Sequence, residues 1–118
     1  MYLLTEVPSA PSIPEVHDVY ANSLKLTWQP PSNDGGTQIL GYHIEKRTST
    51  AKRWSFVNKE PLIDPYYHLT DLYEGMEYEF RVSAENKMGS GPPSEPCLPV
   101  LAKDPWRKYA DVMLKDVE

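Results

Sequence analysis

Apolar and polar residues alternate strictly along residues 77–84, where every second side chain from Tyr78 to Ala84 is apolar. An alternation of period two is typical of a β-strand that buries one side and exposes the other. The segment Leu24–Trp28 alternates in the same way and is followed by two prolines. Both segments therefore predict strands that bury one face in a shared core.

Five other segments complete a predicted set of seven short strands, separated by turns rich in glycine, proline and asparagine. Their ranges are 15–20, 39–47, 53–57, 66–69 and 94–101. Prolines at and beside the last segment place it at a sheet edge, because proline cannot donate to a strand ladder. Seven such strands predict an all-β, immunoglobulin-like Greek-key sandwich of two sheets.

A corner precedes the strongest strand, where Leu72 and Gly75 are followed by Tyr78. A tyrosine in this place returns its hydroxyl to the backbone upstream and fixes the corner. The expected structural residues are Trp28, Tyr42, Leu72 and Tyr78, and Ile44, Leu69, Phe80 and Val82 are expected to be buried with them.

Composition narrows the class of protein. The chain has 118 residues, enough for one domain with its ends. Its 12 basic and 17 acidic residues give a net charge of −5, which argues against nucleic acid or an anionic membrane surface as a partner. The lone Cys97 forms no internal disulfide, and the sequence shows neither a signal peptide nor a membrane-spanning run. These features favour an intracellular origin.

No residue pattern indicates catalysis, a cofactor or a metal. His17, His43 and His68 fall at outward positions on three strands, without the short spacing typical of zinc ligands. The segment 89–91 is no nucleophile elbow, because it runs into two prolines rather than a helix. Cys97 has no basic neighbour in sequence to activate it and is interpreted as a small half-buried side chain.

Charged residues occupy the outward positions of two strands expected to be neighbours. Glu45 and Arg47 should lie beside Glu79 and Arg81. Crossed pairs of opposite charge would stabilise the sheet by roughly 0.2–1 kcal/mol each. The face is either a surface for a partner or a solvated sheet face, and the sequence leaves both open.

Trp28, Tyr42, the Leu72–Tyr78 corner and the closing Ser94–Pro96 together resemble the fibronectin type III family over residues 8–102. The resemblance implies a domain that binds, spaces and transmits force, and that does not catalyse. The rival interpretation is a ligand-binding module of a cell-surface receptor or adhesion protein.

A narrower resemblance is carried by Trp28–Gly36, by Ile39–Glu45 and by Ala84–Pro96. These segments look like the type III domains of the muscle proteins titin, twitchin, myosin-binding protein C and myomesin, and Pro99–Pro105 is most similar to titin. This resemblance implies a structural and docking module in the cytoplasm of the sarcomere. Its implied partners are flanking immunoglobulin or type III domains and thick-filament proteins such as myosin.

The two ends complete the expected organisation. Residues 1–7 are expected to be a linker remnant and residues 103–118 a tail or a linker helix. Asp104 is a suitable helix cap and Pro105 a suitable first helical residue. The stripe of Trp106, Tyr109, Ala110, Met113 and Val117 has helical spacing. We expect either a helix of about three turns or a frayed tail. In the helical case Trp106, Tyr109 and Met113 would contact this domain, the next one or a second copy of the chain.

Overall fold

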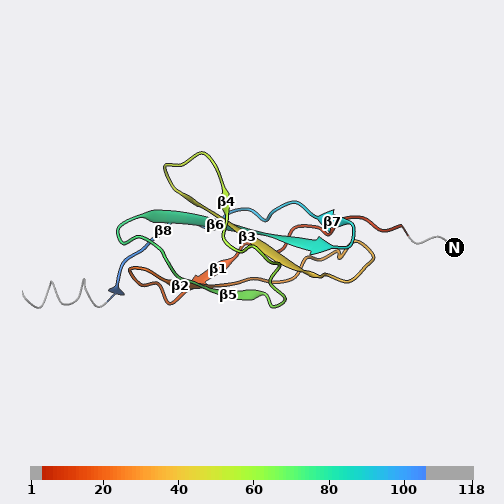
Figure 1. Cartoon of the computed structure of the whole chain (residues 1–118), viewed down its shortest axis with the longest axis horizontal. Coiled ribbons are helices and arrows are strands. Elements are labelled where there is room, and N and C mark those ends of the chain that lie inside the picture. The colour runs from red at the N-terminus through yellow and green to blue at the C-terminus, as the bar shows by residue number, and fades with distance from the viewer. Residues whose placement is uncertain (1–3, 106–118) are drawn as a thin grey trace, which may run out of the picture.

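The computed structural model describes residues 4–105, and these form eight strands in two sheets. The smaller sheet has the order β1-β2-β5, and the larger has the order β4-β3-β6-β7 with β8 also paired to β6. Figure 1 shows the two layers packed on each other, as expected for the sandwich. The strand bounds are β1 Glu15–His17, β2 Leu24–Thr27, β3 Gly41–Thr48, β4 Ser55–Phe56, β5 Tyr66–Leu69, β6 Glu77–Asn86, β7 Gly89–Ser90 and β8 Val100–Leu101.

All eight residues expected in the core are buried between the sheets. β2 contributes Leu24 and Leu26, which are fully buried, while Lys25 and Thr27 alternate with them on the other side. β6 repeats this pattern around Phe80. The alternation in the sequence therefore selects the buried side of each strand, because successive side chains of a strand point to opposite faces.

The segment expected to be one strand over 94–101 is different. Only β8 is a regular strand there, and β7 lies in what was expected to be a loop. The segment still follows β6, because the backbone N–H groups of Gly91, Ser94 and Cys97 donate in turn to the carbonyls of Ala84, Val82 and Phe80. Its donors recur every three residues, which is the period of polyproline II rather than of a β-strand. The prolines Pro92, Pro93, Pro96 and Pro99 explain this, since they have no N–H to donate.

The tyrosine corner is confirmed. The Tyr78 hydroxyl oxygen accepts a hydrogen bond of 2.8 Å from the backbone N–H of Tyr73. Gly75 adopts φ 87° in the turn between them, a conformation that favours glycine. The same turn is bonded to the residue that follows β8, since the Gly75 N–H donates to the carbonyl of Ala102.

Replacing Tyr78 by phenylalanine should lower the free energy of unfolding by about 1–3 kcal/mol, because the ring stays while the Tyr73 N–H loses its acceptor. Urea denaturation measures the change. Tyr73→Phe is the matched control, because the Tyr73 side chain is exposed. Equal midpoints for the two variants would show that the corner bond contributes nothing.

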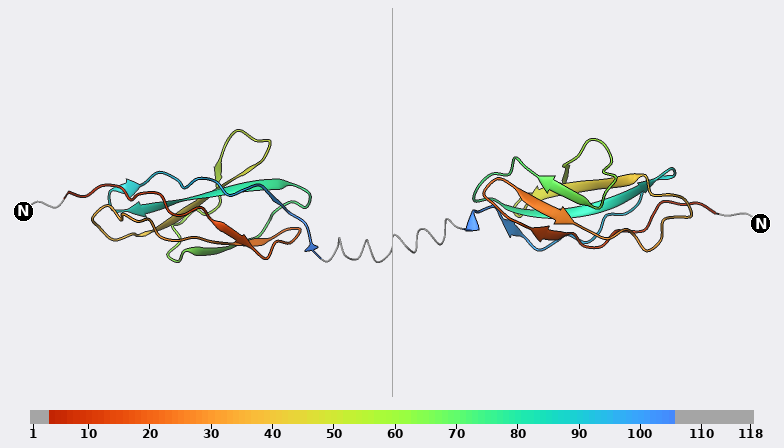
Figure 2. Two further views of the ribbon diagram at one scale, coloured as in Figure 1. Left: turned by 180° about the vertical axis from the view of Figure 1, so that it is seen from behind. Right: turned by 90° about the horizontal axis from the view of Figure 1, so that it is seen from below.

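The described chain begins and ends at opposite ends of the sandwich, as both views in Figure 2 show. The expected helix over residues 105–118, with Trp106, Tyr109 and Met113, lies outside the described residues except for Pro105. The side chain of Asp104, expected as its cap, accepts a hydrogen bond of 2.8 Å from the backbone N–H of Ala21.

Candidate interaction surface

The outer face of the larger sheet carries a square of four charged side chains. The register of β3 and β6 sets Glu45 opposite Arg81 and Arg47 opposite Glu79. Arg81 donates from Nε and Nη2 to the two carboxylate oxygens of Glu45, each at 3.1 Å. Arg47 donates from Nε at 3.2 Å and from Nη2 at 3.0 Å to one oxygen of Glu79. The strand register therefore produces two ion pairs side by side.

Trp54 covers this square, and sequence reasoning missed it. The guanidinium carbon of Arg47 lies 4.4 Å from the centroid of the Trp54 ring, and that of Arg81 lies 4.3 Å from it. Both are cation–π contacts. Trp54 and Phe56 alternate along the segment expected as a strand. The observed pairing of β4 with β3, extended by one residue, sets Trp54 opposite Arg47.

A Trp54→Ala variant should lose roughly 1–2 kcal/mol of stability, since the two cation–π contacts are lost and the ring no longer shields the two guanidinium groups from water. Trp54→Phe should recover part of this loss, because it keeps an aromatic face. Thermal melting of the three proteins provides the measurement. A melting midpoint unchanged in Trp54→Ala would mean that the stack is incidental.

The four charged side chains are thus paired with one another and partly covered, with side-chain exposures of 15–29%. Groups in this state present little free charge to a partner. Their role as an interaction face, with that of Trp106, Tyr109 and Met113, stays a prediction.

The expected structural residues lie in the core. Trp28, which directly follows β2, and Tyr42 on β3 make an edge-to-face contact with ring centroids 5.5 Å apart. Burial raises the pKa of the Tyr42 hydroxyl above its usual value, because a phenolate would be poorly solvated there. The indole N–H of Trp28 has no hydrogen-bond partner among the described residues. Leu72 and Tyr78 are buried at the corner.

The three histidines lie on different parts of the surface. His17 is within 2.9 Å of the Thr27 hydroxyl. His43 is half-buried and its Nε2 lies 2.8 Å from a carboxylate oxygen of Glu85. His68 is exposed on β5. Within residues 4–105 no three potential ligands gather around a metal position, and no helix there is long and apolar enough to cross a membrane.

Cys97 is more buried than expected, and its backbone N–H donates to the carbonyl of Phe80. Burial raises the pKa of the thiol, which disfavours the reactive thiolate. The side chain fits a packing role.

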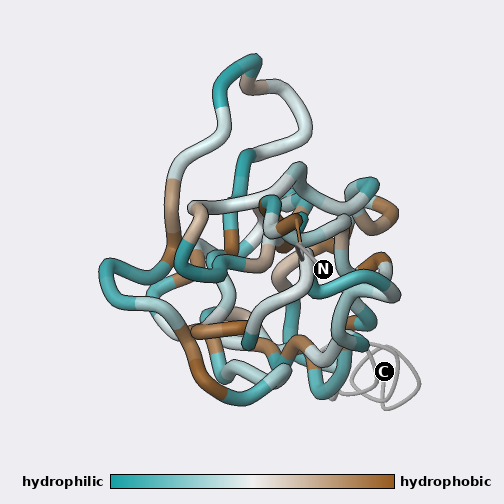
Figure 3. The backbone as a smooth tube through the Cα atoms, turned by 90° about the vertical axis from the view of Figure 1, so that its right-hand side faces the viewer, coloured by the Kyte–Doolittle hydropathy of each residue, from teal (hydrophilic) through white to brown (hydrophobic). Residues whose placement is uncertain are grey.

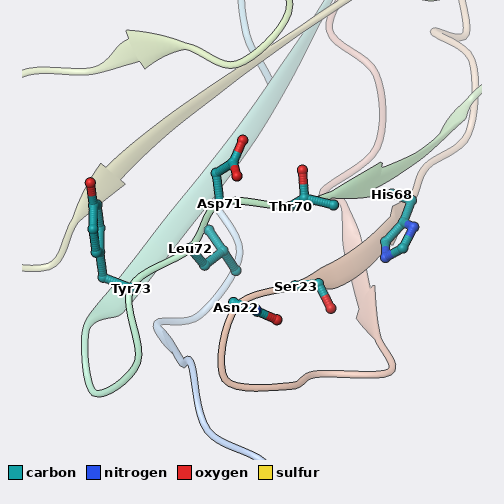
Figure 4. A pocket seen from close by; sticks show the side chains of 7 residues that line it. All are labelled: Asn22, Ser23, His68, Thr70, Asp71, Leu72 and Tyr73. Carbon is teal, nitrogen blue, oxygen red and sulfur yellow. The ribbon is translucent and has the colours of Figure 1, made fainter.

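A hollow of about 450 Å³ lies beside the tyrosine corner, between the end of β5 and the turn before β2. Asp71 adopts φ 64° in its rim. Figure 4 shows the Asp71 and Thr70 side chains on one side of the hollow and those of Asn22 and Ser23 on the other. Since the polar groups do not converge on one point, the hollow has no arrangement suited to chemistry on a substrate.

Each end of the described chain is hydrogen-bonded to the fold. At the N-terminal end, the side-chain amide of Asn86 donates to the carbonyls of Glu6 at 2.7 Å and Asp34 at 2.8 Å. The Glu6 N–H also donates to Gly35. A Cβ on Gly35 would overlap the Glu6 carbonyl oxygen, so only glycine allows this close approach.

At the other end, the Ala102 N–H donates to the carbonyl of Met76 at 3.0 Å. Together with the bond from Ala21 to Asp104, this fixes the segment that leaves β8. The two attachments involve different loops at opposite ends of the sandwich (Figure 1). A pull on both ends of the chain would therefore load them before it reaches the core.

Comparison with known proteins gives a consistent result. The family model described as "Fibronectin type III domain" matches residues 9–99. Cardiac-type myosin-binding protein C of Mus musculus is 32% identical over 112 residues, which is 95% of this chain and 9% of that protein. Titin of Drosophila melanogaster is 41% identical over 87 residues, 74% of this chain and, rounded, 0% of titin. The solved structure of domains A168-A170 from titin superposes with a TM-score of 0.81 at 40% identity, covering 85% of this chain and 34% of that one.

Proposed function

Because the chain belongs to the fibronectin type III family, we propose that it is a non-catalytic module that spaces and docks the parts of a multidomain muscle filament protein. Its similarity to domains of titin and of cardiac myosin-binding protein C supports this proposal. The chain spans only a small share of those relatives, so their whole-protein activities are not transferred to it.

The observation that carries the proposal is the attachment of both ends of the described chain, at Glu6 and at Asp104. The carbonyl of Glu6 is held by Asn86, and the carboxylate of Asp104 accepts from Ala21 at the far end. A module in a tandem protein receives force at these two places. Hydrogen bonds across both places resist peeling of the terminal segments, which is the property that a spacer under load requires.

The proposed partners follow from the same relatives. Flanking immunoglobulin or type III domains would attach at the two ends, and thick-filament proteins such as myosin would contact the sides. The proposed location is the cytoplasm of the sarcomere.

A tandem array of the full chain stretched in an optical trap tests the load-bearing role. Each copy should unfold in one cooperative step and refold on release, with the same steps in the presence of a chelator or a reductant. Gradual extension at low force, without steps, would refute the role. Steps that vanish with chelator or reductant would show that a metal or a disulfide bears the load instead.

A further inference from the structure

Positive charge is concentrated in one segment of an acidic protein. Residues 46–59 contain 5 of the 12 basic residues and none of the 17 acidic ones. The remaining residues therefore hold 7 basic and 17 acidic side chains. The segment comprises the end of β3, the connection to β4, β4 itself and the residues that follow it.

Of these five cations only Arg47 has a carboxylate partner among residues 4–105, and three of the other four are exposed. Lys52, Arg53 and Lys59 are exposed, and no carboxylate of residues 4–105 lies within ion-pair distance of them. Arg47, by contrast, is engaged by Glu79. The connection that carries Lys52 and Arg53 stands out from the body of the domain in Figure 1, and its tip is hydrophilic in Figure 3. The positive charge of this protruding loop, residues 48–54, is therefore exposed to solvent.

An exposed aromatic side chain lies beside the protruding loop. Phe56 on β4 is 67% exposed, although Trp54 two residues earlier is half-buried on two guanidinium groups. Phe56 lines two hollows. One, of about 410 Å³, is formed with His43, Asn58 and Lys59. The other, of about 300 Å³, extends toward Ser83 and Pro93. Lone exposed aromatics are ordinary, but this one divides two hollows next to three unpaired cations.

We propose that this surface, formed by Lys52, Arg53, Phe56 and Lys59, binds an acidic, extended polypeptide segment of a partner protein. Charge complementarity selects an acidic ligand, since Lys52, Arg53 and Lys59 have no ion-pair partner within residues 4–105. In the part of the chain that the structure describes, β4 is the edge of its sheet and β3 is its one partner strand, so an extended chain can lie along it. Apolar side chains of that segment would enter the hollows on either side of Phe56.

Nucleic acid is a poorer match for this surface. Proteins bind nucleic acid through basic stripes on basic domains, whereas the net charge of this chain is −5. This binding surface goes beyond the load-bearing role, since it uses the side of the domain and neither of its attached ends.

The test is a titration of the full chain with a short labelled peptide in which glutamate alternates with leucine, followed by fluorescence anisotropy and amide NMR shifts. Shifts should concentrate at residues 52–59. The double variant Lys52→Glu/Arg53→Glu should weaken binding by roughly tenfold or more, which is about 1.4 kcal/mol. Phe56→Ala should weaken it as well, while both variants keep the wild-type melting midpoint.

The matched control is Lys87→Glu/Lys103→Glu, which makes the same change in net charge at two other exposed lysines. It should bind the peptide as the wild type does. Equal loss of binding in the control, or equal binding of a peptide with lysine in place of glutamate, would overturn the proposal. Tighter binding of a DNA duplex or of anionic vesicles at the same residues would overturn the choice of partner. The choice of partner would also be overturned if the chain associates with itself and the Lys52→Glu/Arg53→Glu variant does not.

Discussion

Asn86→Ala is expected to lower the free energy of unfolding by about 2–4 kcal/mol, from the loss of three hydrogen bonds worth roughly 1 kcal/mol each. The side chain is 2% exposed. Its amide donates to Glu6 and Asp34, and its oxygen accepts from the N–H of Met88 at 2.8 Å. One side chain thus connects the incoming chain, the turn before β3 and the turn after β6.

Two controls make the Asn86 experiment specific. Asn86→Asp keeps the shape and the acceptor for Met88 but removes both donors, so it should be nearly as destabilised as the alanine variant. Asn22→Ala removes an exposed asparagine and should change stability by less than about 0.5 kcal/mol. Urea denaturation separates the outcomes, and a wild-type midpoint for Asn86→Ala would exclude the bridging role.

Phe80→Ala should be the most destabilising single change, at about 3–5 kcal/mol. Phe80 is completely buried on β6 between the two sheets, so its removal leaves a cavity that the surrounding strands fill only in part. The chain supplies its own control in Phe56→Ala, because the ring of Phe56 is largely exposed. Similar losses of stability in the two variants, measured in urea, would contradict the assignment of the core.

The sequence predicted those parts of the fold that depend on simple alternation. In β2 and β6 the buried side follows from every second residue, and the corner follows from the placing of Tyr78 after Leu72 and Gly75. The same alternation led us to expect Glu45 and Arg47 beside Glu79 and Arg81. The register of β3 with β6, which alternation does not fix, sets Glu45 opposite Arg81, and the two are bonded.

Other features depend on contacts between distant segments, which no local pattern encodes. Gly35 was interpreted as a turn residue only, yet it also makes room for the backbone of Glu6. Asn58 lies between the predicted strands 53–57 and 66–69, but its side chain donates to the carbonyl of Tyr42 and accepts from the N–H of Ile44 in the core. The boundary expected at residue 8 stays a prediction.

The most direct test of the central claim is the unfolding force of the chain pulled through its two ends, compared between the wild type and variants that weaken the attachment of one end. Asn86→Ala removes the side-chain donor to the Glu6 carbonyl, and Asp104→Ala removes the acceptor for Ala21. Asp104→Asn keeps that acceptor and serves as the control. If the ends carry the load, both alanine variants unfold at lower force while Asp104→Asn and Phe56→Ala match the wild type. An unfolding force unchanged in both alanine variants would contradict the claim that the attached ends bear the load.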